Sequence, residues 1–250
     1  MLLLDHIVFL VKDLDKAVKD FQAAGYIVSK GGKHDNGITQ NALIHFENGT
    51  FLELLALQKS WRVFLVKWLI KIPQFRLDVL DNPFPETGTR FMMRALLCKE
   101  GIIDFCLLAN NGLADYEEIK CRDLLLTIHT EMKRKRPDGL ELKWNVFAPL
   151  AHNLPFAMTP YQPTFKPPSE NLKHPNGAKG FEKVKVYVND LENCVLQYEA
   201  LLGAPPVEET ETYALFQLQR GQIEVINSDK RTTTGIGFLE MDLQLRVKSY

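Results

Sequence analysis

The sequence predicts an α+β protein in which one strand–helix–strand–strand–strand unit, βαβββ, recurs along the chain. Two observations support this prediction. Short apolar stretches typical of strands alternate with stretches whose apolar residues fall at helical spacing. The same order of stretches then begins three times, near residues 4, 102 and 181. The copies share few identical residues, so the repeat is one of element order.

The first copy occupies residues 1–57 and gives the clearest signals. Its opening strand is apolar on both faces except for His6, and Asp13 is a suitable N-cap for the helix that follows. Its last two strands flank Asn48-Gly49, a strong short signal for a β-hairpin. The expected elements are a strand over 4–11, a helix over 14–24, and strands over 26–29, 41–46 and 50–57.

The second copy occupies residues 101–160 and the third occupies residues 181–228. For the second copy we expect a strand over 102–108, a helix over 116–133, and strands over 140–147 and 155–158. For the third copy we expect a strand over 181–188, a helix over 191–202, and strands over 213–218 and 222–226. An additional strand within residues 235–250 is expected to pair with the third copy.

Two stretches lie outside the repeat. Residues 58–100 are interpreted as a helical insertion in which Trp61, Phe64 and Trp68 lie at helical spacing. Such a stripe indicates packing, either over the first copy or against a second chain in a homodimer, more than it indicates a cofactor site. Residues 161–180 contain several prolines and are expected to form an extended linker.

Composition restricts the classes of function. The formal net charge is −1, and 46% of the residues are hydrophobic and 24% charged, which is typical of a soluble globular protein. With no strong net charge, neither nucleic acid nor a membrane is expected as a partner. The basic run 133–136 lies at an expected hairpin without interleaved aromatic residues, and we interpret it as a solvated turn.

Cysteine usage and the N-terminus indicate a compartment. The four cysteines show no C-x-x-C spacing, which predicts free thiols in a reducing environment. The N-terminus lacks the basic region of a signal peptide, and no apolar run approaches the roughly 18 residues of a membrane span. We therefore expect a cytoplasmic protein that acts on, or binds, a small-molecule ligand.

A histidine on the first strand of a βαβββ unit and a glutamate on its last strand resemble the vicinal oxygen chelate superfamily, which contains glyoxalase I, extradiol dioxygenases and bleomycin-resistance proteins. The resemblance is closest to glyoxalase-like domain proteins, over residues 4–8, 11–14, 32–43, 49–54 and 174–178. It implies repeated modules that form open, curled mixed β-sheets with helices on the outer face. It also implies that metal and substrate lie on the concave inner face.

The resemblance implies a divalent metal ion such as Zn, Mn, Fe or Ni, held by two ligands from each of two modules. His6 and Glu53 are the pair from the first module, and imidazole and carboxylate are suitable ligands. If the second module completes the site, Asp104 matches His6, while the last-strand position falls near residues 157–159, none of which is a strong ligand.

If the third module completes the site instead, Lys183 matches His6, and a protonated lysine does not bind a metal. Glu224 would match Glu53, but Glu53 follows its hairpin glycine by four residues and Glu224 by three. The alignment therefore needs a one-residue adjustment, and such a slip moves a side chain to the other face of the sheet.

Glu53 is also the predicted catalytic residue. A carboxylate among apolar strand residues needs a partner in the folded protein, and without a metal Glu53 could act as a general base. The alternative is a glutamate at a strand edge, in solvent. Substrate contacts are expected from His34 in a glycine-rich loop, from Thr39 and Asn41 downstream of it, and from Lys183, which could bind an anionic substrate.

Two hypotheses for the function follow. In the first, the protein is a metal-dependent lyase, isomerase or dioxygenase, and the metal acts as a Lewis acid on the vicinal oxygens of a small substrate. In the second, the curled sheet is a non-catalytic module of the bleomycin-resistance type that sequesters a small apolar or aromatic compound. The incomplete ligand set favours the second hypothesis. A scaffold that has lost its site is a third.

Overall fold

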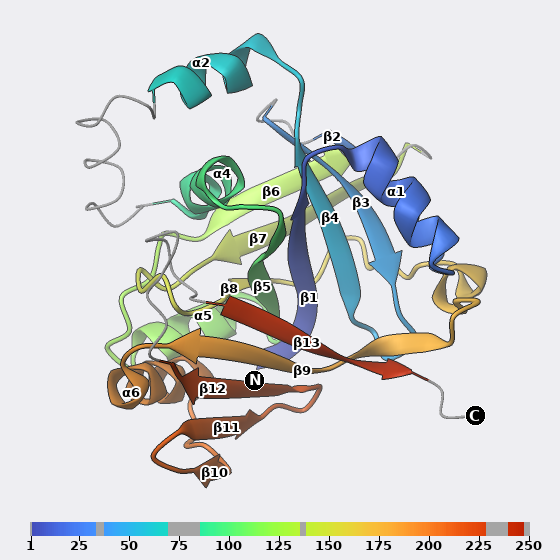
Figure 1. Cartoon of the computed structure of the whole chain (residues 1–250). Helices are drawn as coiled ribbons and strands as arrows, with labels where there is room; N and C mark the ends of the chain where they lie inside the picture. Colours follow the sequence, from blue (N-terminus) through green and yellow to red (C-terminus); the bar gives the residue numbers. More distant parts are fainter. Residues whose placement is uncertain (1, 34–37, 70–85, 136–138, 229–239, 248–250) are drawn as a thin grey trace.

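The computed structural model describes residues 2–33, 38–69, 86–135, 139–228 and 240–247, and these form two β-sheets with their helices (Figure 1). The strands of the first two units are β1 (Leu2–Val11), β2 (Ser29–Lys33), β3 (Thr39–His45), β4 (Phe51–Leu57), β5 (Gly101–Ala109), β6 (Thr130–Lys135), β7 (Glu141–Phe147) and β8 (Phe156–Met158). Those of the third unit are β9 (Ala178–Val188), β10 (Glu208–Glu209), β11 (Tyr213–Gln217), β12 (Gln222–Asn227) and β13 (Glu240–Val247).

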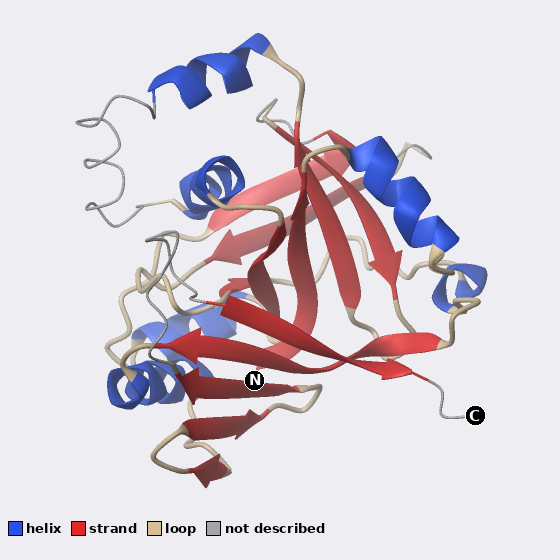
Figure 2. Ribbon diagram, in the orientation of Figure 1, coloured by secondary structure: helices blue, strands red, loops and turns tan. Residues whose placement is uncertain are grey.

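The larger sheet joins the first two units edge to edge. Its eight strands follow the order β2-β3-β4-β1-β5-β8-β7-β6. The two opening strands, β1 and β5, run antiparallel at its centre, and each has the last strand of its own unit as a parallel neighbour. The sheet curls, and helix α1 (Leu14–Ala23) lies on its outer face (Figure 2). This confirms the predicted class of α+β folds with curled, mixed sheets.

The third unit repeats half of that sheet. Its strands follow the order β10-β11-β12-β9-β13, with β12 parallel to β9 and β13 antiparallel to it. Strand β13 therefore stands beside β9 as β5 stands beside β1. Helix α6 (Leu191–Leu202) packs on this sheet, capped by the Asp190 side chain at its start and ended by Gly203 in the left-handed region.

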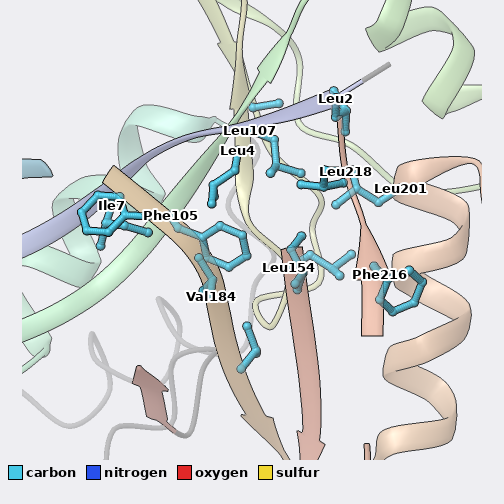
Figure 3. Close-up of a cluster of buried hydrophobic side chains, with 14 of the residues drawn as sticks. Leu2, Leu4, Ile7, Phe105, Leu107, Leu154, Val184, Leu201, Phe216 and Leu218 are labelled. Carbon is cyan, nitrogen blue, oxygen red and sulfur yellow. The ribbon is translucent and has the colours of Figure 1, made fainter. Parts of the chain in front are cut away.

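The main core lies between the two sheets. Ile7 of β1 and Phe105 of β5 belong to one buried cluster with Val184 of β9 and Phe216 of β11 (Figure 3). Successive strand residues point to opposite faces of the sheet. Ile7 and Phe105 therefore belong to the outer face of β1 and β5, which the third unit covers, and the residues next to them belong to the inner, concave face. Burial of these side chains contributes about 1.5–3 kcal/mol each.

The described part of the insertion contains two helices, α2 (Trp61–Leu69) and α4 (Thr87–Leu97). Helix α4 lies inside the curl of the large sheet, where Phe91 and Ala95 pack with Val8, Leu55 and Cys106 (Figure 2). The aromatic stripe of α2 does not pack on the first unit as we expected. Its large side chains are instead mostly exposed: Trp61 72%, Phe64 74% and Trp68 56%. The homodimer alternative stays a prediction.

The helix expected over 116–133 is wrong in both position and length. Helix α5 spans Leu113–Lys120, and Asp123 then turns the chain with a positive φ of 57°. The following stretch is extended, because Thr127 donates from its backbone to Ala148 and Leu150 donates to Leu125. Its apolar residues resembled a continued helix, but backbone hydrogen bonds to a distant segment hold it extended.

The proline-rich segment is tied to the first unit. His174 accepts a hydrogen bond at Nδ1 from the backbone of Ile27 (2.9 Å) and donates from Nε2 to the carbonyl of His45 (3.0 Å). A short 3₁₀ helix, η1 (Ser169–Leu172), precedes it. Among the residues that the structure describes, no helix is long and apolar enough to cross a membrane. The four cysteines are free thiols, as predicted.

Candidate functional site

A cavity of about 110 Å³ lies on the concave face of the large sheet. Strands of the first unit form one wall, strands of the second unit form the opposite wall, and helix α4 contributes to its rim. Most of the lining is apolar. The lining side chains that carry polar or charged groups are His6, Thr39, Asn41, Glu53, Arg134 and Tyr161, and the principal apolar ones are Phe51, Phe91, Met132, Trp144, Phe156 and Met158.

His6 and Glu53 meet at this cavity. The Nε2 atom of His6 lies 3.8 Å from Oε2 of Glu53. The ring of Phe51 stacks on the imidazole at 4.3 Å, and Phe156 meets it edge-on at 5.4 Å. Asn41 donates from Nδ2 to Oε1 of Glu53 at 2.6 Å. Both side chains are therefore held in position, and the imidazole, at 4% exposed, is almost removed from solvent.

The opposite side of the imidazole is fixed by Asp5. The carboxylate of Asp5 lies 2.9 Å from Nδ1 of His6, and because an ionised carboxylate can only accept, Nδ1 is the donor. This places the acceptor nitrogen, Nε2, toward Glu53 and the cavity. Asp5 reaches the same side as His6 because β1 carries a register shift between Leu4 and His6.

The third unit reaches this pair through Arg220, which lies in the turn between β11 and β12. Arg220 donates from Nη2 to Oδ1 of Asp5 (3.3 Å) and from Nε to the carbonyl of Leu4 (2.7 Å). The chain of contacts Arg220–Asp5–His6–Glu53 therefore links two strands of the first unit to the β11–β12 turn of the third. Asp5 is 6% exposed, so the guanidinium compensates a carboxylate that has little access to water.

The residues present do not fit a resident divalent metal. Asp5, His6 and Cys106 have potential ligand atoms within 4.8 Å of one another, but the Asp5 oxygens already accept from His6 and Arg220. Burial raises the pKa of the Cys106 thiol well above its ordinary value, and its Sγ atom donates to the carbonyl of Leu107 at 3.4 Å. At the cavity, His6 and Glu53 supply two ligands where catalytic zinc sites use three.

The second unit does not supply the other half of the ligand set. Asp104 points toward the inner face, opposite Val8, but its carboxylate lies against two buried arginines of α4. Arg90 contacts it from Nε at 3.2 Å, and Arg94 contacts it from Nη1 at 3.0 Å. Burial, and then the neighbouring Arg90, lowers the pKa of Arg94 to about 10. These two ion pairs occupy the Asp104 carboxylate, which the resemblance implied as a metal ligand.

The last strand of the second unit is equally unsuited to a metal. Within the expected positions, residues 157–159, only Met158 lines the cavity. Phe156, two residues earlier on the same face of β8, lines it as well. Ala157 belongs to the core on the other face. The part of the cavity wall that β8 contributes is thus apolar, which suits the carbon skeleton of a ligand.

The remaining predicted site residues divide into three groups. Thr39 and Asn41 line the cavity with His6 and Glu53. Lys183 and Glu224 are not among its lining residues and instead contact each other at 2.9 Å on the sheet of the third unit. His34 lies outside the described residues.

Sequence reasoning missed three residues that matter at this site. Asp5 adjoins His6 in the sequence, but strict alternation would place it on the other face, and only the register shift reverses that. The basic run 133–136 predicts a solvated turn, but Arg134 lies on β6 and lines the cavity because its side chain points to the opposite face from that of Lys133. Arg220 gave no signal, since it acts across 215 residues of sequence.

Comparisons with known proteins agree with this architecture. The model of the glyoxalase-like domain family matches residues 4–202. Among solved structures, a hypothetical protein from Staphylococcus aureus is similar over 92% of this chain and 87% of its own, with 16% identity and a TM-score of 0.68. A methylmalonyl-CoA epimerase from Streptomyces coelicolor, in complex with 2-nitronate-propionyl-CoA, matches 64% of this chain and 98% of its own, with 18% identity and a TM-score of 0.38.

Because the family model covers most of the chain, the protein belongs to the glyoxalase-like domain family, within the vicinal oxygen chelate superfamily. The corresponding epimerase from Mycobacterium tuberculosis is similar over 62% of this chain and 85% of its own, with 17% identity and a TM-score of 0.38. At 16% identity, the likeness to the Staphylococcus aureus protein shows the fold alone. The comparison with curated proteins gives no match.

Proposed function

We propose that the protein is an enzyme that transfers a proton on a small molecule held in the concave cavity, with Glu53 as general base. The observation that carries this proposal is the 3.8 Å approach of His6 Nε2 to Glu53 Oε2 inside an otherwise apolar cavity. Two proton-accepting groups that face one small space suit a reaction in which a proton leaves one substrate atom and returns to another.

The neighbours of the pair give each residue a role. Asn41 holds Oε1 of Glu53, which orients the carboxylate toward the cavity. Asp5 holds Nδ1 of His6 and stabilises the imidazolium that forms when Nε2 accepts a proton. Glu53 would take a proton from a carbon next to a carbonyl group and return it, or a solvent deuteron, to the same or the adjacent carbon of the enolate. Where that carbon bears a hydroxyl group, Nε2 of His6 would accept the hydroxyl proton and donate it to the former carbonyl oxygen, so that each base ends as it began. Asp5 is a positioning residue that acts through His6.

Deuterium exchange from heavy water tests this proposal without knowledge of the complete reaction. Small 2-oxo acids and hydroxyketones are incubated with the protein in D₂O, and exchange at the carbon next to the carbonyl is followed by proton NMR. We expect exchange with wild type and a large loss with Glu53→Gln and with His6→Asn. Equal exchange in wild type and Glu53→Gln would contradict a role of Glu53 as base.

The same proposal predicts independence from metal, because the donor set falls short of a resident site. Exchange is expected to survive EDTA, and protein purified without chelator is expected to carry less than one equivalent of divalent metal. One equivalent of bound metal that is lost in Glu53→Ala would contradict this expectation and restore the metal-dependent hypothesis.

A second candidate function is a non-catalytic binding module. It is favoured by the aromatic and thioether lining of the second unit, in which Trp144 packs edge-on against Tyr161 at 5.1 Å. Binding of a probe with no deuterium exchange in any substrate class would support this candidate over the enzyme.

A further inference from the structure

Arg134 is the only arginine or lysine among the described residues that line the cavity. It comes from β6, the edge strand of the second unit, and the curl of the sheet brings that edge to the same cavity as β1 and β4. Arg134 is a half-buried residue. Arg134 therefore lies on the cavity wall that the second unit contributes, and His6 and Glu53 lie on the wall that the first unit contributes.

The contacts of Arg134 differ from those of the comparable arginines. Arg90 and Arg94 contact Asp104, Arg122 contacts Glu118, and Arg220 contacts Asp5. Among the described residues the side chain of Arg134 has neither a carboxylate partner nor a hydrogen bond, and only its backbone is paired, with Leu142 of β7. A partly desolvated guanidinium without an anion is unfavourable, and a carboxylate that arrives with a ligand would remove that cost.

We propose, resting on the function proposed above, that the substrate is a small organic monocarboxylate with an apolar body, and that Arg134 binds its carboxylate. The planar fork of a guanidinium matches a carboxylate with two parallel hydrogen bonds. The body of the ligand would lie against Phe156, Met132 and Trp144, and its reactive carbon would lie toward Glu53.

Size and charge narrow the ligand class further. A cavity of about 110 Å³ is close to the roughly 150 Å³ that accommodates benzene in a designed cavity, so the ligand body is limited to a few carbon atoms or one ring. A phosphate dianion is disfavoured, because one guanidinium faces it while the carboxylate of Glu53 lines the same space.

Binding of matched probes tests the proposal. Benzoate and benzamide, and isobutyrate and isobutyramide, have nearly the same shapes and differ in charge. We expect wild type to bind each carboxylate about 10- to 100-fold more tightly than its amide in calorimetry or ligand-observed NMR, which corresponds to a charge-assisted hydrogen bond. Inorganic phosphate serves as a third probe and is expected to bind more weakly than the carboxylates.

Variants assign the preference to one side chain. Arg134→Gln is expected to abolish the discrimination between carboxylate and amide, and Arg134→Lys to retain part of it, because an ammonium does not offer the two-pronged contact. Lys133→Gln removes the same charge from the neighbouring, exposed position on β6 and should leave the discrimination unchanged. Melting temperatures show whether each variant is folded.

The possible outcomes separate this inference from the proposed function. Equal binding of acid and amide by wild type, no binding of either at millimolar concentration, or unchanged discrimination in Arg134→Gln would each overturn the role of Arg134. If discrimination is lost in Arg134→Gln but no substrate exchanges deuterium, the anion site stands and the enzymatic proposal fails. If exchange occurs only with neutral ketones, the enzyme stands and the anion site fails.

Discussion

The first and third units place the same strand positions side by side and fill them with different chemistry. In the first unit, Glu53 on β4 pairs with the residue two positions after His6 on β1. In the third unit, Glu224 on β12 pairs with the residue two positions after Lys183 on β9. Lys183 thus takes the place of His6, and Glu224 takes the place of Glu53. The facing nitrogen and oxygen atoms are 3.8 Å apart in the first pair and 2.9 Å apart in the second.

The difference shows how one scaffold can support a reactive site or an ion pair. A lysine ammonium only donates hydrogen bonds, and it holds Glu224 as a partner. The imidazole of His6 can accept a proton and return it, so Glu53 lies beside a second group that can take part in proton transfer. Asn41 pairs with the residue two positions after Glu53, and Tyr213 pairs with the residue two positions after Glu224, so Tyr213 is the equivalent of Asn41 in the third unit. The hydroxyl of Tyr213 donates to Glu208 and not to Glu224. The third unit therefore retains the geometry of the site without its chemistry.

Replacing Glu53 or Glu224 by glutamine should give the largest difference in activity between the first and third units. Glu53→Gln is expected to reduce deuterium exchange by about 10²–10⁴-fold, the usual contribution of a general base. Glu224→Gln is the matched control at the equivalent position and should leave exchange within about twofold of wild type, well inside the range of a general base. Comparable losses in both variants would contradict the distinction drawn between the units.

The buried charges of the second unit predict a large effect on stability. Asp104→Ala leaves Arg90 and Arg94 without their carboxylate, and we expect the free energy of unfolding to fall by about 3–5 kcal/mol. Urea denaturation measures the change. In Lys183→Met, which breaks the more accessible pair of the third unit, the loss should be about 1 kcal/mol or less. Similar losses in the two variants would argue against a structural role specific to Asp104.

The contact from the third unit to Asp5 predicts a moderate effect on activity. Arg220→Met should lower deuterium exchange by about tenfold, because Arg220 acts on His6 through Asp5 and outer partners of metal-bound histidines, the nearest comparison, contribute about 10–100-fold. Arg122→Met is the control, because Arg122 also bridges to the third unit, through the carbonyls of Ala200 and Leu201, but does not contact Asp5. Exchange that falls equally in both variants would indicate loosening of the interface as a whole.

Mild acid is expected to produce the smallest effect. Burial, and then Arg90 and Arg94, lowers the pKa of His152 to about 4, and burial lowers the pKa of His174 as well. The unfolded chain takes up these protons near pH 6.5, so the stabilisation is complete above that pH and is lost as the pH falls toward 4. Urea midpoints across this window should decline less steeply in His174→Gln than in wild type. Parallel declines would exclude a contribution from His174.

The fold was predictable from the sequence because its signals are local. Apolar alternation, the cap at Asp13 and the Asn48-Gly49 turn each act within a few residues, and they predict the βαβββ order. The helix expected after residue 116 failed because backbone hydrogen bonds to Ala148 and Leu125, formed over longer distances, hold that segment extended. The equivalence of Glu224 and Glu53 was hard to see in the sequence, because the two hairpins differ in length and the glutamates therefore lie at different distances from their turn glycines. Phe46 and Thr50 close a turn of three residues, whereas Leu218 and Gly221 close one of two.

The sequence by itself determined the repeated unit, the family, and the presence of His6 and Glu53 on adjacent strands of the first unit, because strand identity and side-chain alternation depend on neighbours along the chain. Only the tertiary structure decided that the first two units share a sheet, that two arginines of α4 neutralise Asp104, and that Asp5, Arg134 and Arg220 join the site. Those contacts depend on a register shift, on the curl of the sheet and on packing between distant segments. None of these leaves a periodic signal in the sequence.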